Sequence, residues 1–288
     1  MEIILGKTAG FCGGVINAVT KTENELENGK KIYCLGELTH NAVVMSNLEK
    51  KGLCVVEDVD EVPEEETMII RAHGVPPEIY EKAKKRKIRV VDLTCPKVLK
   101  IHKRVEEYIQ NGYFLFLTGK KNHPETVGIC GYGKEKLEVI ESLDDIEEAI
   151  KKMKEKKPKK IAIISQTTFS MEKFEQIVNI LKKEFTNLEI NNTICSATKI
   201  RQEETEDISK QVDAMIIIGG KNSSNTKKLH EIASKNCKNV FLIETKEELN
   251  IENIKKFKKI GIMAGASTPT ISIEETIDCI NAITTKNR

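Results

Sequence analysis

The middle of this 288-residue chain contains Ile88-Arg89-Val90-Val91-Asp92-Leu93-Thr94-Cys95-Pro96, in which a β-branched run leads to a cysteine and then to a charged segment with helical spacing. The same pattern occurs twice more, at Gly10-Phe11-Cys12-Gly13-Gly14 after Ile3-Ile4-Leu5, and at Asn192-Thr193-Ile194-Cys195-Ser196 after Leu188-Glu189-Ile190. A cysteine between a strand and a helix lies where backbone N–H groups favour negative charge. Three such cysteines can meet at one metal centre and leave a coordination position open for chemistry.

Working outward from these cysteines, strands and helices are expected to alternate along the chain. Apolar runs predict strands at 2–5, 31–35, 67–71, 88–92, 113–118, 160–164, 187–190, 213–218, 239–243 and 259–263. Helical spacing predicts helices at 14–28, 41–51, 77–86, 97–111, 144–155, 171–184, 197–211, 225–235 and 272–283. Such alternation is typical of α/β architecture with largely parallel sheets.

Polar turns after the predicted strands recur in the same order and indicate an internal repeat. The first unit has turns at 36–41 and 71–74 and then Cys95; the second has turns at 119–125 and 165–168 and then Cys195. The third has turns at 219–225 and 264–269, and it gains Cys12 if the strand at 2–5 joins it. We therefore expect three small α/β lobes over 13–95, 96–195 and 196–288, the last joined by residues 1–12. Ligands in open α/β sheets bind at the carboxyl ends of strands, so these turns should line one polar cavity.

The side chains in these turns suit a phosphate group. Three of the five histidines, His40, His73 and His123, lie there. Small hydroxyl and amide residues at the predicted helix starts add donors for an anion, namely Ser223, Ser224, Asn225, Ser267 and Thr268. Glu125 and Thr167 are the remaining groups able to handle protons. The sequence thus predicts an anion site beside a three-thiolate metal centre, with one acid or base.

Other cysteines and histidines have simpler interpretations. We interpret five cysteines as small apolar residues, namely Cys34, Cys54, Cys130, Cys237 and Cys279. His102 and His230 fall inside helical stretches, and we interpret them as surface or capping groups.

The composition and the lack of a signal pattern favour a cytoplasmic protein. The N-terminus shows no secretory signal pattern, and the longest apolar runs, such as Met215-Ile216-Ile217-Ile218, are too short to cross a bilayer. Eight cysteines in a reducing compartment favour metal binding or burial over a disulfide framework. A net charge of +2 gives no reason to expect nucleic acid, and the basic runs lack aromatic residues for base stacking.

The spacing of the three cysteines leaves two kinds of metal centre open. They lie 83 and 100 residues apart, which excludes a local zinc knuckle. Zinc bound by three cysteines and a water fits the residues. A cubane iron–sulfur cluster with three cysteines and one uncoordinated iron fits better, because no clear fourth protein ligand stands beside the anion site.

Beyond these patterns, the chain closely resembles the 4-hydroxy-3-methylbut-2-enyl diphosphate reductase family, which acts last in the non-mevalonate isoprenoid pathway. The resemblance covers essentially the whole chain through the motifs Ala9-Gly10-Phe11-Cys12, Arg71-Ala72-His73-Gly74-Val75, Thr94-Cys95-Pro96, Asn122-His123-Pro124-Glu125, Gln166-Thr167-Thr168, Thr193-Ile194-Cys195, Asn222-Ser223-Ser224-Asn225 and Gly265-Ala266-Ser267-Thr268-Pro269.

The resemblance implies an α/β fold of three lobes in a pseudo-threefold cloverleaf around a central 4Fe-4S cluster. It implies that Cys12, Cys95 and Cys195 bind this cluster and leave one iron open. The implied substrate-binding residues are His40, His73, His123, Thr167, Ser223, Ser224, Asn225 and Ser267. The implied catalytic residues are Glu125, Thr167 and His123, with Glu125 and Thr167 protonating the substrate hydroxyl.

The implied reaction is the reductive dehydration of 4-hydroxy-3-methylbut-2-enyl diphosphate, an allylic alcohol, to isopentenyl and dimethylallyl diphosphate. It takes two electrons and two protons and releases water. The implied electron donor is a ferredoxin- or flavodoxin-type protein, with neither nucleic acid nor membrane as a partner. Two other classes fit the residues taken alone, a zinc-dependent phosphoesterase or lyase and a non-enzymatic iron–sulfur sensor.

Overall fold

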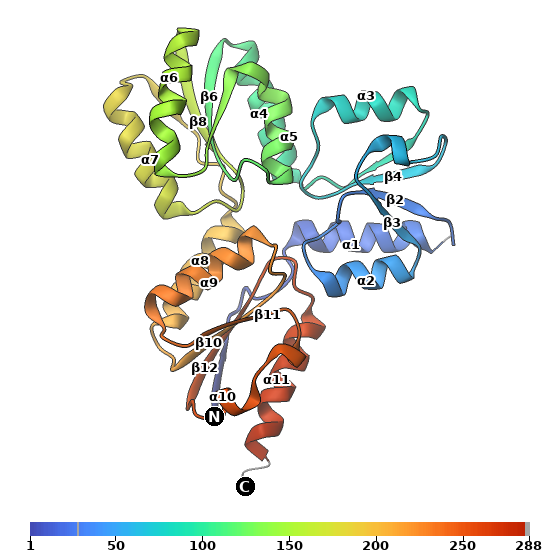
Figure 1. Ribbon diagram of the computed structural model, residues 1–288, viewed down its shortest axis with the longest axis vertical. Coiled ribbons are helices and arrows are strands. Elements are labelled where there is room, and N and C mark those ends of the chain that lie inside the picture. Colours follow the sequence, from blue (N-terminus) through green and yellow to red (C-terminus); the bar gives the residue numbers. More distant parts are fainter. Residues whose placement is uncertain (28, 286–288) are drawn as a thin grey trace. The chain divides into compact units, whose positions relative to one another are not determined.

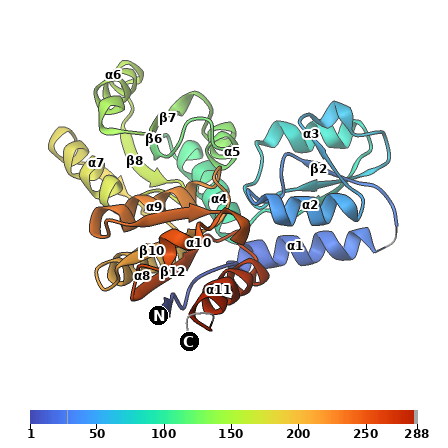
Figure 2. The ribbon, with the colours of Figure 1, turned by 60° about the horizontal axis from the view of Figure 1, so that its bottom comes forward.

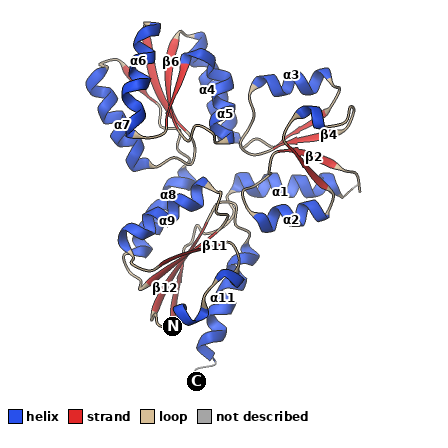
Figure 3. Ribbon diagram, in the orientation of Figure 1, coloured by secondary structure: helices blue, strands red, loops and turns tan. Residues whose placement is uncertain are grey.

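The computed structural model describes residues 1–27 and 29–285 of the chain. Helices and strands alternate along these residues (Figure 3). Their strands form three sheets of four strands each, and every strand pairing among them is parallel. The predicted α/β class with parallel sheets is therefore confirmed.

The first sheet along the chain has the strand order β3-β2-β4-β5, with β2 at Ile32–Leu35, β3 at Leu53–Val56, β4 at Thr67–Ile70 and β5 at Arg89–Asp92. Helix α3 (Pro77–Lys85) packs on one face, where Ala83 joins a core that contains Met68 and Ile70. Helices α1 (Gly13–Leu26) and α2 (Ala42–Lys50) come before and after β2 in the chain. A salt bridge joins the last turn of α1 to the edge strand β5, with Oε2 of Glu25 2.7 Å from Nη1 of Arg89.

The second sheet has the order β7-β6-β8-β9, with β6 at Tyr113–Thr118, β7 at Leu137–Ile140, β8 at Lys160–Ser165 and β9 at Leu188–Ile190. Helices α4 (Pro96–Gln110) and α5 (Pro124–Gly133) cover one face, and α6 (Ile146–Lys156) and α7 (Met171–Glu184) cover the other (Figure 1). Successive residues of β6 face opposite cores, because strand side chains alternate: Leu115 and Leu117 meet α4 and α5, while Phe114 and Phe116 meet α6 and α7.

The third sheet has the order β1-β12-β10-β11, with β1 at Glu2–Leu5, β10 at Ala214–Ile218, β11 at Val240–Ile243 and β12 at Lys259–Ala264. Helices α8 (Ser196–Ser209) and α9 (Ser224–Asn236) share a core with Met215 and Ile217. Helices α10 (Ile251–Ile254) and α11 (Thr270–Thr285) share the opposite core with Ile216 and Ile218 (Figure 2).

The three sheets have one topology. In each, the first strand lies between the second and the third, and the fourth lies at the edge, provided that β1 is counted as the fourth strand of its sheet. Strand β1 does pair with β12, from Glu2 opposite Lys259 to Leu5 opposite Ile262. Each fourth strand leads into a segment with one of the three predicted ligand cysteines. Since the carboxyl ends of parallel strands lie at one edge, each sheet gathers its polar turns and its cysteine there.

The described residues fold into two compact units. Unit 1 comprises Met1–Thr20, Thr39–Lys51 and the described part of Ser196–Arg288, with the β1-β12-β10-β11 sheet. Unit 2 comprises the described part of Lys21–Leu38 and Gly52–Cys195, with the other two sheets. The lobe boundaries at 13–95, 96–195 and 196–288 stay predictions.

Short segments complete the secondary structure of residues 1–27 and 29–285. Four 3-10 turns lie at Val59–Glu61, Lys134–Lys136, Leu143–Asp145 and Lys246–Glu248. None of the described helices combines the length and the apolar character that a membrane span requires.

Candidate functional site

Each predicted ligand cysteine lies directly before a helix, at the junction that the sequence pattern indicates. Cys12 precedes α1, Cys95 is the N-cap of α4, and Cys195 precedes α8. Their backbone N–H groups make one repeated contact, each donating to a carbonyl in the turn after the neighbouring strand: Cys12 to Ala266 at 3.0 Å, Cys95 to Ala72 at 3.0 Å and Cys195 to Thr167 at 2.9 Å. The three junctions therefore share one local structure.

The three thiols are partly exposed and are not in disulfides. In unit 2, the Sγ atom of Cys195 lies 3.2 Å from Nζ of Lys97, which is in the first turn of the helix that Cys95 caps. Two of the cysteine junctions thus lie within the length of one lysine side chain. Partly exposed thiols at helix N-termini have the setting of thiolate ligands for soft metals. The donors therefore fit an iron–sulfur or zinc centre.

Two of the remaining five cysteines, Cys34 and Cys130, have thiols whose pKa is raised by burial. Cys34 is fully buried, and burial raises the pKa of its thiol to about 12. Burial likewise raises the pKa of Cys130 to about 11. A thiol with so high a pKa stays neutral at physiological pH and is a poor metal ligand. The surroundings of Cys34 and Cys130 agree with their interpretation as small apolar residues.

Glu125 has the most defined surroundings of the predicted acid–base groups. Its carboxyl group is 2% exposed in the first turn of α5. Thr167 donates twice to it, from the backbone N to Oε1 at 2.7 Å and from Oγ1 to Oε2 at 2.7 Å. Strands β6 and β8 pair directly, and the turns that follow them carry these two residues.

The pKa of Glu125 is suited to proton transfer. Burial raises the pKa of its carboxyl group to about 7, against the two hydrogen bonds from Thr167, which lower it. A carboxyl group with such a pKa is partly protonated near neutral pH. It can therefore act as a general acid there, which an ordinary glutamate cannot do efficiently.

His123 and His73 lie together in unit 2. His123 is the N-cap of α5, and its Nδ1 accepts a hydrogen bond from the backbone N of Glu125 at 3.1 Å. The proton of the neutral ring is therefore on Nε2, which can donate to an anion. The ring of His73 stands edge-on to it, with centroids 5.2 Å apart and planes at 88°. The turns after β4 and β6 thus place two histidines side by side.

Unit 1 holds the other predicted anion-binding residues. Ser223 caps α9, with Oγ accepting from the backbone N of Thr226 at 3.3 Å; Ser224 and Asn225 follow in the first turn. Asn225 and Ser267 are 4% and 8% exposed, yet both amide atoms of Asn225 and the hydroxyl of Ser267 have no hydrogen-bond partner among the described residues. Each unpaired buried group costs about 1–3 kcal/mol, so these atoms mark a place for a polar ligand.

His40 approaches this group within unit 1 through its backbone. A Cβ atom on Gly220 would lie 1.9 Å from the carbonyl oxygen of His40. Only a glycine therefore lets the turn after β10 come this close to the segment that leads into α2. The contact brings His40 to the turn that carries Ser223, Ser224 and Asn225.

The loop before Cys12 is fixed by α8 within unit 1. Arg201, which is 3% exposed, donates from Nε to the Thr8 carbonyl and from Nη2 to the Gly10 carbonyl, both at 2.9 Å. Glu204, one turn further, accepts from the backbone N of Lys7 at 2.6 Å and of Thr8 at 2.9 Å. These contacts hold the backbone that presents Cys12.

The interpretation of His102 as a surface or capping group is wrong. Its side chain is 2% exposed, and burial lowers the pKa of the ring to about 4. Neither ring nitrogen has a hydrogen-bond partner among the described residues. The helical spacing of the apolar residues could have predicted this burial. Val98, Ile101 and Val105 form the buried face of α4, and His102 lies on the same face.

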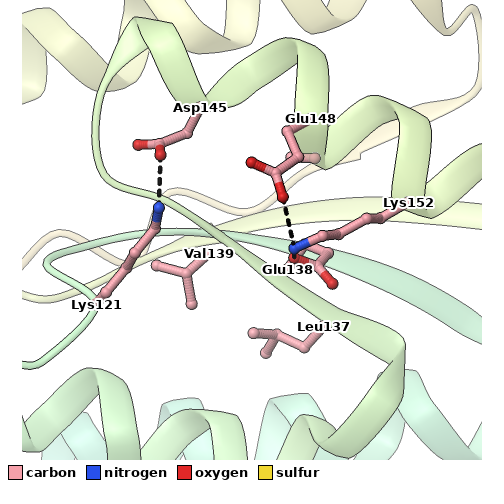
Figure 4. Close-up of a pocket in the computed structure, with 8 residues that line it drawn as sticks. Lys121, Leu137, Glu138, Val139, Asp145, Glu148 and Lys152 are labelled. Carbon is pink, nitrogen blue, oxygen red and sulfur yellow. Dashed lines mark hydrogen bonds and ion pairs between the residues drawn. The ribbon is translucent and has the colours of Figure 1, made fainter.

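A surface groove of unit 2 lies elsewhere, beside β7 and α6 (Figure 4). It has a volume of about 320 Å³, and none of the predicted site residues lines it. Its charges are already paired: Lys121 with Asp145 at 2.6 Å, and Lys152 with Glu148 at 3.2 Å and with Glu138 at 3.4 Å. The groove therefore offers no unpaired charge for a ligand.

Comparison with known proteins agrees with this geometry. Residues 3–281 match the family model described as LytB protein. A 4-hydroxy-3-methylbut-2-enyl diphosphate reductase of Clostridioides difficile is 44% identical over 281 residues, covering 96% of this chain and 98% of the relative. A protein of the same name from Aquifex aeolicus is 40% identical, covering 96% of this chain and 94% of the relative.

Two solved structures are similar over almost the whole chain. One is the E-1-hydroxy-2-methyl-but-2-enyl-4-diphosphate reductase from Plasmodium falciparum, with a TM-score of 0.89, 33% identity, and coverage of 98% of this chain and 88% of that one. The other is described as (E)-4-hydroxy-3-methyl-but-2-enyl diphosphate reductase, the terminal enzyme of the non-mevalonate pathway. It has a TM-score of 0.71 and 39% identity, and it covers 98% of this chain and 100% of that one.

Proposed function

The chain belongs to the LytB family, and from this membership we propose which residues bind the iron–sulfur cluster, which bind the diphosphate and which donates a proton. The enzyme is a 4-hydroxy-3-methylbut-2-enyl diphosphate reductase of the isoprenoid pathway. It converts its small diphosphate substrate, by reductive dehydration, to isopentenyl and dimethylallyl diphosphate.

We assign a 4Fe-4S cluster with one open iron to Cys12, Cys95 and Cys195. Support comes from the three matching junctions, the partial exposure of these thiols and the neutral, buried state of Cys34. When bound, the cluster supplies the electrons and a Lewis-acidic iron for the substrate hydroxyl. A ferredoxin- or flavodoxin-type protein is the proposed electron donor.

We assign the diphosphate to the polar side chains of the turns that follow the strands. Unit 2 offers His73 and His123, the latter with its Nε2–H available to donate. Unit 1 offers His40, Ser223, Ser224, Asn225 and Ser267. The unpaired polar atoms of Asn225 and Ser267 support this assignment most directly, because a diphosphate oxygen or its water would complete their hydrogen bonds.

Glu125 is assigned as the proton donor to the departing hydroxyl. The reaction takes two electrons and two protons: the allylic C–O bond breaks, the hydroxyl leaves as water, and a proton adds to one of two carbons. Hydroxide is a poor leaving group, so protonation by Glu125 lowers the barrier to C–O cleavage. Thr167 holds the carboxyl group through both oxygens and fixes its direction.

The strongest support for these assignments is a set of hydrogen bonds made by Thr167. Thr167 gives its N–H and hydroxyl to the acid Glu125, while its carbonyl accepts from the backbone N of Cys195. A single turn of unit 2 therefore joins the acid–base pair to a ligand cysteine. A salt bridge would need a cation, and none pairs with Glu125 among the described residues; a helix-capping role would not require its burial.

The test is anaerobic purification followed by iron, sulfide and zinc analysis and a reductase assay. We expect iron and sulfide in wild type, and loss of cluster and activity when Cys12, Cys95 or Cys195 is changed to Ser. Cys279→Ser is the matched control and should retain both. A colourless zinc protein would contradict the assigned centre, and normal turnover in Cys195→Ser would remove the three-ligand model.

A further inference from the structure

His102 is a buried histidine for which the reaction described above has no use. It lies in α4, seven residues after Cys95, with 2% of its side chain exposed. Both ring nitrogens lack a hydrogen-bond partner among the described residues. An imidazole buried in this way costs stability that an apolar side chain of similar size would not. Packing of the hydrophobic core alone therefore does not explain why a histidine occupies this position.

The ring lies between two glycines of different segments in unit 2. A Cβ atom on Gly74 would lie 2.5 Å from Cε1 of His102 and 3.3 Å from Nε2. A Cβ atom on Gly128, in α5, would lie 3.5 Å from Nε2 and equally far from the backbone of Gly74. The two backbones therefore meet at glycines, and the edge of the His102 ring fills the space between them.

The outer face of the ring is covered by an aromatic residue. Tyr132, near the end of α5, stacks on it with centroids 4.3 Å apart and planes at 24°. The ring is thus held on its face by Tyr132 and at its edge by Gly74 and Gly128. Such a flat, enclosed space admits a five-membered ring and leaves little room for movement.

The elements that meet at this ring carry the site residues of unit 2. Gly74 closes the turn that contains His73, with its N donating to the Arg71 carbonyl at 3.0 Å. Cys95 is the N-cap of α4, His123 is the N-cap of α5, and Glu125 lies in the first turn of α5. The edge-on pairing of His73 and His123 at 5.2 Å therefore depends on how closely Gly74 approaches α5.

We propose that His102 is a positioning residue, whose ring sets the approach of the 71–74 turn to α5 and so aligns His73 with His123 for one diphosphate. The proposal rests on the proposed function, since it takes these two histidines as diphosphate ligands. His102 itself touches neither substrate nor cluster ligand in this role. It acts through the backbone of Gly74 and Gly128.

The test compares two cavity-forming variants of α4 in the anaerobically purified holoenzyme. His102→Ala removes the ring, whereas Ile101→Ala removes a neighbouring buried side chain that faces the core of the β7-β6-β8-β9 sheet. Both should lower the melting temperature. Binding of inorganic pyrophosphate is then measured by calorimetry, well below both melting temperatures, with His73→Ala and His230→Ala as references.

We expect His102→Ala to weaken pyrophosphate binding about tenfold, approaching His73→Ala, while Ile101→Ala and His230→Ala bind like wild type. Equal affinities in His102→Ala and Ile101→Ala would overturn the proposal, since burial alone would then explain the histidine. If His73→Ala itself binds like wild type, the diphosphate assignment fails, and the positioning role fails with it.

A second variant keeps the proposal testable if His102→Ala does not fold. Tyr132 is only half-buried, so Tyr132→Leu should fold while removing the stacked face of the ring. We expect it to weaken pyrophosphate binding about threefold with unchanged iron content, because the ring would lose the stacking contact that holds its face. Wild-type affinity in Tyr132→Leu contradicts a positioning role for the ring.

Discussion

At the scale of single residues, the surroundings of Glu125 give the strongest indication of its proposed role as a proton donor. It is buried with no ion-pair partner among the described residues, and Thr167 donates a hydrogen bond to each of its two carboxylate oxygens. We predict that Glu125→Gln retains the cluster and binds substrate with near-normal affinity. Its kcat should fall by at least about a hundredfold, because Gln supplies no transferable proton. Single-turnover kinetics with a chemical reductant measures this, and wild-type-like dehydration would mean that another group supplies the proton.

The raised pKa of Glu125 also predicts a pH dependence. The wild-type rate should fall above about pH 7 as the carboxyl group loses its proton, and this fall should be absent in Glu125→Gln.

The same raised pKa predicts that the stability of the folded protein also depends on pH. The folded pKa is about 7 and the ordinary value is 4.5, so the contribution of Glu125 to stability falls as pH rises between them. Gln cannot ionise, so Glu125→Gln should become steadily more stable relative to wild type over that window.

Asn225 gives a prediction in which stability and binding move in opposite directions. Both of its amide atoms are buried and lack a partner among the described residues. Asn225→Leu, of similar size, removes that cost and should stabilise the ligand-free protein by about 1–3 kcal/mol. It should also weaken pyrophosphate binding. Urea unfolding and calorimetry measure the two effects, and a destabilised Leu variant would show that Asn225 is satisfied in the protein itself.

The sequence singled out the candidate site residues but none of their hydrogen bonds. The glutamate was singled out by its motif, whereas its burial and its pairing with Thr167 depend on how β6 and β8 lie side by side. His102 was misinterpreted because a single histidine in a helix rich in charged residues is usually expected to be exposed. The apolar stripe of α4 on which it falls would have corrected this interpretation.

At the scale of elements, the sequence predicted most strands and helices within about two residues. It missed β3 and β7, although each is four residues long, as long as several strands that were predicted. It also missed α5, whose ten residues include three glycines and a proline. Glycine is a poor helix former in isolation. At Gly131 the close approach of α5 to another segment requires it, because a Cβ atom there would lie 2.2 Å from Cβ and 2.9 Å from Cα of Pro76.

Gly220 provides a prediction for the turn that leads into α9. Ala at this position would place a Cβ atom 1.9 Å from the His40 carbonyl, so one of the two segments must move. We expect Gly220→Ala to lose about tenfold in pyrophosphate affinity, because His40 and Ser223 would no longer keep their spacing. Gly13→Ala is the control: nothing lies within 4 Å of its added Cβ atom, so binding should be unchanged. Wild-type binding in Gly220→Ala would mean that this contact does not matter to the ligand.

At the scale of the whole molecule, the repeat of strand order is the feature that the sequence could indicate only indirectly. Similar turns at similar spacing suggested three units, and the pairing of β1 with β12 gives the third sheet its fourth strand. The described residues also group into two compact units, of which unit 1 gathers three separate segments. Such grouping depends on contacts between residues far apart in sequence, which no local pattern encodes.

This grouping leads to a prediction about removal of the metal centre. Cys12 belongs to unit 1, whereas Cys95 and Cys195 belong to unit 2. A ligand stabilises whatever folded residues bind it, by about 2.7 kcal/mol at a hundred times its dissociation constant. Under the proposed three-cysteine model, the cluster should therefore stabilise both units together. We expect one thermal transition in the anaerobic holoenzyme and two separate transitions after chelation, as measured by differential scanning calorimetry. Cys195→Ser should resemble the chelated protein without any chelator, and Cys279→Ser should resemble wild type. If chelation shifts only one transition, the cluster is held by the cysteines of one unit, and the three-ligand assignment is wrong.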